Sequence, residues 1–194
     1  MTLWKQNISQ LYSVLEKLSV RDTDQKELEC EEGFSRWKEL TIQVRSNGGV
    51  IYFIGNGASA SMASHFAADI AKNGGIRTHV FTDPALITAL ANDLSFEKVF
   101  SEPLHWCMKE GDMLIAISSS GNSPNIIRGV EEARGLGGIV ITLSAMGEDN
   151  RIRGSGHLNF YAASQTYGLA ETAHAAILHY WMDVMDSATN KYLP

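Results

Sequence analysis

Residues 51–70 read IYFIGNGASASMASHFAADI, an apolar run that breaks into glycines and then resumes at helical spacing. The pattern predicts a strand, a tight turn and a helix. Gly55 and Gly57 allow the backbone to turn sharply and expose its amide groups, and the following helix begins with unpaired N–H groups and the positive end of its dipole. The stretch therefore predicts an anion-binding turn that suits a phosphate group.

A polar pair follows within the same predicted helix. His65 and Asp69 are four residues apart, and residues at this spacing share one helix face. Their side chains can therefore hold one metal ion or one substrate next to the anion-binding turn.

The rest of the chain alternates helix and strand patterns. Apolar stripes predict helices over residues 2–18, 32–46, 85–92, 125–136 and 169–188, and apolar runs predict strands over 78–82, 113–117, 139–143 and 157–161. The acidic run from Asp22 to Glu32 is typical of a solvated loop between two helices. Alternating strands and helices form βαβ units, so we expect an α/β protein whose parallel sheet is covered by helices on both faces.

Length and composition favour one soluble domain. The chain has 194 residues, of which 44% are hydrophobic and 20% charged, as is usual for a globular domain of this size. We expect this single domain to consist of a helical part over about residues 1–47, a sheet core over about 50–161 and a C-terminal helix over about 169–188.

Charge and hydropathy argue against several classes of partner. A net charge of -6 with a pI near 5.5 does not suit a nucleic-acid groove, which needs a basic stripe. No apolar run approaches the roughly 20 residues of a membrane span, and the N-terminal MTLWKQNISQ lacks the order of a signal peptide. We therefore expect a cytoplasmic protein with no nucleic-acid or membrane partner.

A second anion-binding loop is predicted after the strand at 113–117. Four serines fall within residues 118–123, and their hydroxyl and backbone groups can surround a phosphate with uncharged donors. Residues 55–60 also fit the looser GxGxxA form of a dinucleotide fingerprint, but Asp83 is followed at once by Pro84, so the ribose-binding acid has little support. Because ligands bind beyond the carboxyl ends of parallel strands, both loops should face one ligand.

Four motifs together carry a family resemblance. They are Gly55-Asn56-Gly57-Ala58-Ser59, His65, Asn92-Asp93 and the stretch from Ser118 to Ser123. In order and spacing they resemble the sugar isomerase (SIS) domain, and within it the phosphoheptose isomerases. The resemblance covers nearly the whole chain. It implies a three-layer α/β/α sandwich with a flavodoxin-like five-stranded parallel sheet, a homotetramer with active sites at subunit interfaces, and a sugar phosphate substrate, often with zinc.

The resemblance also implies roles for individual residues. It places the phosphate at Ser118, Ser119, Ser120 and Ser123, the sugar at Asn56, Gly57, Ala58, Ser59, Asn92, Asp93 and Glu171, and the metal and catalytic positions at His65, Asp69, Glu171 and His179. The chain departs from the family at four of its positions. Asp69 replaces the usual Glu, Glu171 replaces Gln, and Tyr167 and Leu169 replace a Thr and an Arg.

An aldose–ketose isomerisation needs a base and an acid near C1 and C2 of the sugar. We expect Asp69 to act as the carbon base, His179 as the oxygen acid, and bound zinc to polarise the carbonyl. Glu171 and His179 are two helical turns apart, a rise of about 12 Å, so His174 is an alternative ligand. In this family's terms the substrate is sedoheptulose 7-phosphate and the product a heptose 7-phosphate for cell-surface polysaccharide. The alternative is a non-catalytic SIS module that binds sugar phosphates for regulation or serves as an interaction scaffold.

The N-terminal helices carry apolar residues that a single small sheet covers only in part. Trp4, Leu11, Leu15 and Phe34 lie on these stripes. Exposed apolar stripes often mark protein interfaces, so we expect these side chains to help bury a contact between subunits.

Overall fold

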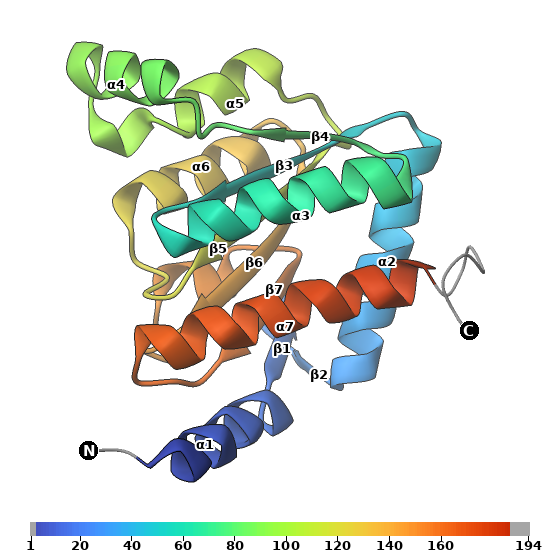
Figure 1. Ribbon diagram of the computed structural model, residues 1–194. Coiled ribbons are helices and arrows are strands. Elements are labelled where there is room, and N and C mark those ends of the chain that lie inside the picture. The colour runs from blue at the N-terminus through green and yellow to red at the C-terminus, as the bar shows by residue number, and fades with distance from the viewer. Residues whose placement is uncertain (1–2, 187–194) are drawn as a thin grey trace.

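The computed structural model describes residues 3–186, and a seven-stranded sheet runs through its centre (Figure 1). Five strands are parallel: β3 (Val50–Gly55), β4 (Arg77–Val80), β5 (Met113–Ser118), β6 (Ile139–Ala145) and β7 (Leu158–Ala162). Their spatial order, β4-β3-β5-β6-β7, is the flavodoxin-like order. The predicted α/β class and the five parallel strands are confirmed, and every residue of β5, β6 and β7 is buried, as a sheet covered on both faces requires.

Two antiparallel strands extend this sheet, where a solvated loop was expected. β1 (Ser19–Asp22) pairs with β7, and β2 (Glu27–Leu28) pairs with β1. Val20 and Leu28 stand opposite each other and are both buried, so these two apolar side chains anchor the pair to the core. Asp22 forms the turn between the strands, because its carboxylate accepts hydrogen bonds from the backbone N–H groups of Asp24 and Lys26. The loop prediction was wrong here because the strands are short, and the acidic residues around Val20 and Leu28 obscure their alternation of buried and exposed side chains.

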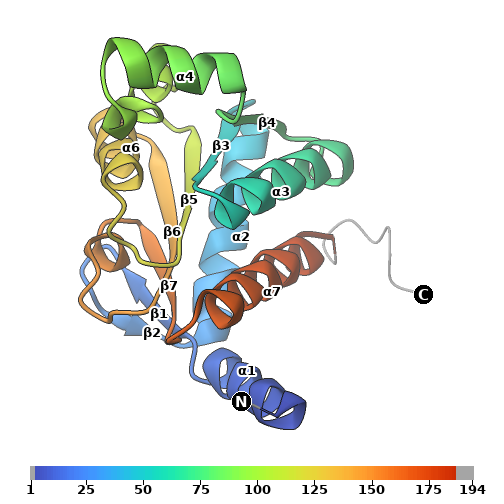
Figure 2. The same ribbon diagram turned by 60° about the vertical axis from the view of Figure 1, so that its left-hand side comes forward.

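Helices cover both faces of the sheet (Figure 2). The helices are α1 (Trp4–Glu16), α2 (Cys30–Ser46), α3 (Ala58–Gly74), α4 (Pro84–Asp93), α5 (Ser101–Cys107), α6 (Pro124–Gly135) and α7 (Tyr167–Asp186), with 3-10 turns η1 (Phe96–Lys98) and η2 (Arg151–Gly154). α2, α3 and α7 pack on one face, and α4, α5 and α6 pack on the other. The six predicted helices are present; only the short α5 was missed. The predicted end of the last helix, near Ala188, lies outside the described residues.

Stacked tryptophans fix α7 against α2 and the sheet. The rings of Trp37 and Trp181 are fully buried, with centroids 4.5 Å apart, and Trp37 also contacts Phe160 of β7. The indole N–H of Trp181 donates a hydrogen bond of 3.2 Å to the Thr41 hydroxyl. Rings of this size contribute much of a core's apolar burial, so this cluster holds α7 in place.

The first helix, α1, carries much of its apolar stripe on the outside. Trp4, Ile8 and Tyr12 are exposed, as is Leu3 just before the helix, although α1 contacts α7. Phe34, which was expected at the same interface, is instead buried in the core. In residues 3–186 no helix combines the length and apolar character needed to cross a membrane.

Candidate functional site

The two predicted loops meet at the carboxyl ends of neighbouring parallel strands. Gly55, the last residue of β3, lies in register with Ile117 of β5. Between the loops is a hollow of about 150 Å³. It is lined by Asn56, Ser59, Ile117, Ser118, Ser119, Ser120, Ser123, Tyr167 and Glu171. Of the predicted contacts, all four serines, Asn56, Ser59 and Glu171 therefore come together in one place.

The glycine loop can only form with glycine at its two key positions. A Cβ on Gly55 would lie 2.6 Å from the backbone carbon of Ser59, and Gly57 has a φ of +56°, which other residues rarely adopt. The carbonyl groups of the turn accept hydrogen bonds from the first turn of α3. The backbone N–H of Ser59 donates to the Asn56 carbonyl at 3.0 Å, and the backbone N–H of Ala60 donates to the Gly57 carbonyl at 3.0 Å. Gly57 and Ala58 thus shape the turn but do not line the hollow.

The serine loop is ordered by its own side chains. The Ser118 hydroxyl accepts from the N–H of Gly121 at 3.2 Å, and the Ser120 hydroxyl accepts from the N–H of Asn122 at 3.3 Å. Ser123 precedes α6, and its hydroxyl makes no capping bond. Among the described residues that line the hollow, none is Lys, Arg or His. An anion in this hollow would have only hydroxyls, backbone N–H groups and helix N-termini to bind it.

The turn η2 holds the serine loop from behind, a feature that the sequence did not reveal. The N–H of Ile152 donates to the Gly121 carbonyl at 3.2 Å, and the N–H of Arg151 donates to the Asn122 side chain at 3.0 Å. The Asn150 side chain packs against Gly121, which has a φ of +63° and no room for a Cβ. Because these contacts join residues about 30 positions apart, no local pattern could predict them.

His65, Asp69 and His179 form a second group farther along the same helices. His65 Nε2 lies 3.3 Å from Asp69 Oδ2, and the His65 and His179 rings have centroids 5.8 Å apart. Both α3 and α7 begin at the hollow and run side by side away from it (Figure 1). The group therefore lies beyond the hollow, along the α3–α7 seam.

The four predicted metal ligands, His65, Asp69, Glu171 and His179, do not surround one point within a single subunit. Glu171 lines the hollow, whereas His179 lies about 12 Å farther along α7 by helical rise. In residues 3–186, no three His, Cys, Asp or Glu side chains come close enough together to hold a metal ion. Asn92 and Asp93, which were predicted to contact the sugar, do not line the hollow. They end α4 and are exposed, and the Asn92 amide nitrogen donates to the Asp93 carboxylate at 2.8 Å.

His174 occupies the core rather than the seam. It is fully buried, and burial lowers the pKa of its imidazole from 6.5 to about 4. The nearby backbone of Ser144 favours the charged form too weakly to offset burial. By distance and angle, no hydrogen bond reaches either ring nitrogen from the described residues. His174 is therefore a core residue that is neutral at neutral pH. It belongs neither to the hollow between the loops nor to the group of His65, Asp69 and His179.

Acid should destabilise the protein through His174. Its pKa is lower in the folded chain, so the unfolded chain binds the extra proton between about pH 6.5 and 4. The free energy of unfolding should fall by about 3 kcal/mol across that window and be insensitive to this group above it. His174→Leu should remove this part of the slope in urea titrations at several pH values. His79→Gln, which replaces an exposed imidazole, should keep the slope, and an unchanged slope in His174→Leu would contradict the assignment.

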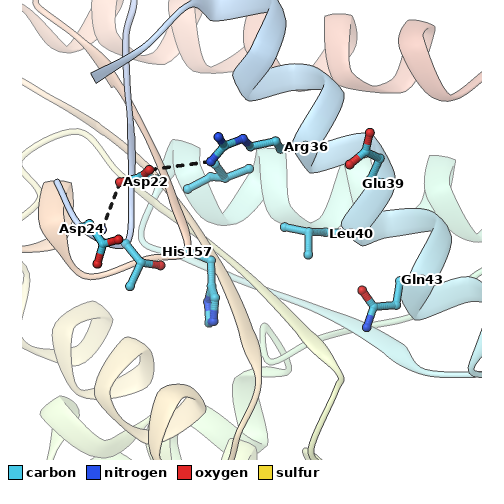
Figure 3. A pocket seen from close by; sticks show the side chains of 9 residues that line it. Asp22, Asp24, Arg36, Glu39, Leu40, Gln43 and His157 are labelled. Carbon is cyan, nitrogen blue, oxygen red and sulfur yellow. Dashed lines mark hydrogen bonds and ion pairs between the residues drawn. The ribbon is translucent and has the colours of Figure 1, made fainter. Parts of the chain in front are cut away.

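A larger hollow of about 520 Å³ lies elsewhere, between α2, the β1–β2 turn and the start of β7 (Figure 3). Two of its charged side chains already pair within the protein: Asp22 lies 3.6 Å from Arg36, and Asp22 also accepts from the N–H of Asp24. The imidazole of His157 accepts from the N–H of Val140 at 2.9 Å. This hollow adjoins the amino end of β7, whereas ligands of such sheets bind at carboxyl ends. Its size therefore does not make it the functional site.

Comparisons with known proteins identify the family of this chain. The SIS domain family model matches residues 23–145. A phosphoheptose isomerase of Fusobacterium nucleatum is 30% identical over 174 residues, which cover 87% of this chain and 86% of that protein. The solved phosphoheptose isomerase GmhA of Neisseria gonorrhoeae superposes with a TM-score of 0.79 at 26% identity, covering 94% of this chain and 96% of that one. The Vibrio vulnificus NanR protein complexed with ManNAc-6P shares only the fold, with a TM-score of 0.65 at 16% identity, covering 97% of this chain and 62% of that one.

Proposed function

The chain belongs to the SIS domain family, and from this premise we propose that it is a phosphoheptose isomerase that converts sedoheptulose 7-phosphate to D-glycero-D-manno-heptose 7-phosphate. It is thus an aldose–ketose isomerase, with a product suited to cell-surface polysaccharide. One observation carries the proposal: a hollow lined by four serines lies at the start of two helices, α3 and α7, whose shared seam also holds Asp69, His65 and His179.

The arrangement suits a phosphorylated sugar in an extended pose. The serine loop offers uncharged donors to the phosphate, and Asn56 and Ser59 lie beside it for the nearest hydroxyls. His65 is seven residues into α3, about 10 Å from the start of the helix by helical rise. By the same measure Asp69 lies about 16 Å from the start of α3. A sugar chain anchored by its phosphate therefore extends along the α3–α7 seam toward these side chains.

The chemistry moves two protons between neighbouring atoms. From the ketose, a base removes a proton from C1 while an acid protonates the oxygen on C2, which gives an enediol. Return of a proton to C2 and loss of the proton on O1 give the aldose. We assign the carbon base to Asp69 and the oxygen acid to His179. His65, 3.3 Å from the Asp69 carboxylate, orients that base.

Turnover is the direct test. Purified protein should interconvert sedoheptulose 7-phosphate and the aldose, and in D2O it should exchange the transferred proton for deuterium, as measured by NMR. If the protein binds the sugar phosphate in calorimetry but neither turns it over nor exchanges the proton, the non-catalytic SIS module takes the place of the enzyme.

Zinc binding is a separate proposal. Two imidazoles and a carboxylate side by side on α3 and α7 are ligands that suit zinc. The described side chains of one chain do not close a site around a metal, so no step above passes through one. We expect purified protein to contain about one zinc per subunit by mass spectrometry, and His65→Ala to lose it while remaining folded. Metal-free protein with full turnover would contradict the proposal.

We further propose a homotetramer, supported by the apolar side chains that α1 exposes. Light scattering at micromolar concentration should give about four times the chain mass of 21.3 kDa. Replacing Trp4 and Ile8 with serine should lower that mass, because both are exposed in the single chain, whereas Leu94→Ser on the far side of the sheet is the control. A monomeric mass for the unmodified protein would overturn this prediction. A cytoplasmic location completes the proposal.

A further inference from the structure

Asn56 and Asn125 form a reciprocal amide pair between the two loops. The amide nitrogen of Asn56 donates to the Asn125 oxygen at 2.9 Å, and the amide nitrogen of Asn125 donates to the Asn56 oxygen at 2.8 Å. The two residues are 69 positions apart. Asn56 follows β3 and Asn125 lies in the first turn of α6, after the serine loop. The pair therefore ties the sugar side of the hollow to its phosphate side.

The orientation of both amides is fixed by the backbone. The N–H of Ile126, which can only donate, bonds to the Asn125 side-chain oxygen at 3.0 Å. Asn125 must therefore present its oxygen to that N–H and its nitrogen to Asn56. With the pair formed, Asn56 keeps one amide hydrogen and one oxygen lone pair free, and Asn56 lines the hollow.

Asn125 has no access to a ligand. It is 2% exposed and is not among the residues that line the hollow, whereas Asn56 is half-buried there. Any effect of Asn125 on a substrate must therefore pass through its neighbours.

Both ends of the bridge are rigid. Asn56 stands between the two constrained glycines, and its carbonyl accepts from the N–H of Ser59. Asn125 follows Pro124, whose ring fixes the backbone at the start of α6. A pair of bonds between two rigid segments sets their separation.

We propose that Asn125 is a positioning residue that holds Asn56 at a fixed distance and orientation from the serine loop, so that one substrate molecule satisfies both loops. This inference rests on the proposed function, because it names the two groups of the substrate as phosphate and sugar hydroxyl. It assigns to Asn125 a role in recognising the sugar without touching it.

The test is a double-mutant cycle on binding. We would measure by calorimetry the dissociation constants of sedoheptulose 7-phosphate and of inorganic phosphate for the unmodified protein, Asn56→Ala, Asn125→Ala and the double variant. Asn125→Ala should weaken sugar-phosphate binding about tenfold, as expected for one misplaced polar contact. Inorganic phosphate, which needs only the serine loop, should change by less than about threefold.

The decisive quantity is the coupling. If Asn125 acts through Asn56, the double variant should bind the sugar phosphate within about twofold of Asn56→Ala alone. Two outcomes would overturn the proposal: a double variant whose loss of affinity is the product of the two single losses, or an Asn125→Ala variant that loses as much affinity for inorganic phosphate as for the sugar phosphate. Asn125→Asp is the isosteric check: it keeps an acceptor for Ile126 but sets an oxygen against the Asn56 oxygen, so it should also weaken sugar-phosphate binding.

A buried asparagine elsewhere gives the matched control. Asn159 is 1% exposed and bonds to Thr142, Gly156 and Arg21, far along the chain from both loops. Asn159→Ala should lower the free energy of unfolding but leave sugar-phosphate binding within about twofold. If the two substitutions are coupled in binding but the protein shows no turnover, only the proposed activity is refuted. If the protein shows turnover but the two losses of affinity multiply, only this inference is refuted. If the unmodified protein does not bind the sugar phosphate, both are refuted.

Discussion

Replacing Gly121 with alanine should reduce kcat/KM for the sugar phosphate by about 100-fold, equivalent to about 2.7 kcal/mol, while leaving the protein folded. Gly121 has a φ of +63°, and a Cβ there would overlap the Asn150 side chain. Relief of that overlap must move either the serine loop or η2, whose N–H groups bond to the loop at Gly121 and Asn122. Displaced hydroxyls no longer surround the phosphate, so inorganic phosphate should also bind more weakly.

Gly48→Ala is the matched control for this substitution. Gly48 has nearly the same φ, +64°, but a Cβ there would meet nothing within 4 Å. Both variants should lose about 1–2 kcal/mol of stability from the left-handed backbone conformation. Only Gly121→Ala should lose activity. Steady-state kinetics, phosphate calorimetry and urea unfolding measure the three quantities, and equal activity in the two variants would show that η2 does not position the loop.

Asp69→Asn should lower kcat by about 100- to 10,000-fold, the usual contribution of a general base. The amide keeps the size of the side chain and its place 3.3 Å from His65, but it cannot accept a proton from carbon. Asp69→Glu should retain activity, because the longer carboxylate still reaches along the α3–α7 seam. His179→Ala should lose turnover for the complementary reason, the absence of the acid.

The control for Asp69→Asn is Asp24→Asn, which makes the same chemical change at the opposite end of the sheet. It should leave kcat unchanged. Proton exchange in D2O separates the roles further, since Asp69→Asn should abolish exchange at carbon even when the sugar phosphate is bound. Full turnover by Asp69→Asn would remove this residue from the mechanism.

The parallel sheet and the two loops could be predicted because their signals are local. A run such as Met113 to Ile117 is apolar throughout because both faces are covered, and the glycines and serines stand directly where strands end. β1 and β2 escaped prediction because only Val20 and Leu28 mark them, and charged neighbours obscure so short a pattern.

The site was predictable where one element carries it or where two strand ends share one edge of the sheet. The helical spacing of His65 and Asp69 placed that pair correctly, and the rise between Glu171 and His179 already indicated that both could not easily reach one ion. Asn125 and the η2 contacts were missed, because they depend on contacts between distant segments of the chain.

The order of the strands also bears on how the protein avoids aggregation. The long apolar strands β5 and β6 lie inside the sheet, and its free edges are β2, with two residues, and β4, with four. Arg21 and Glu27 pair at 2.8 Å across β1 and β2, and Arg77 on β4 is exposed. Short, charged edges offer little template for another chain to add a strand. The two small antiparallel strands thus shield β7, which is buried along its whole length, from intermolecular pairing.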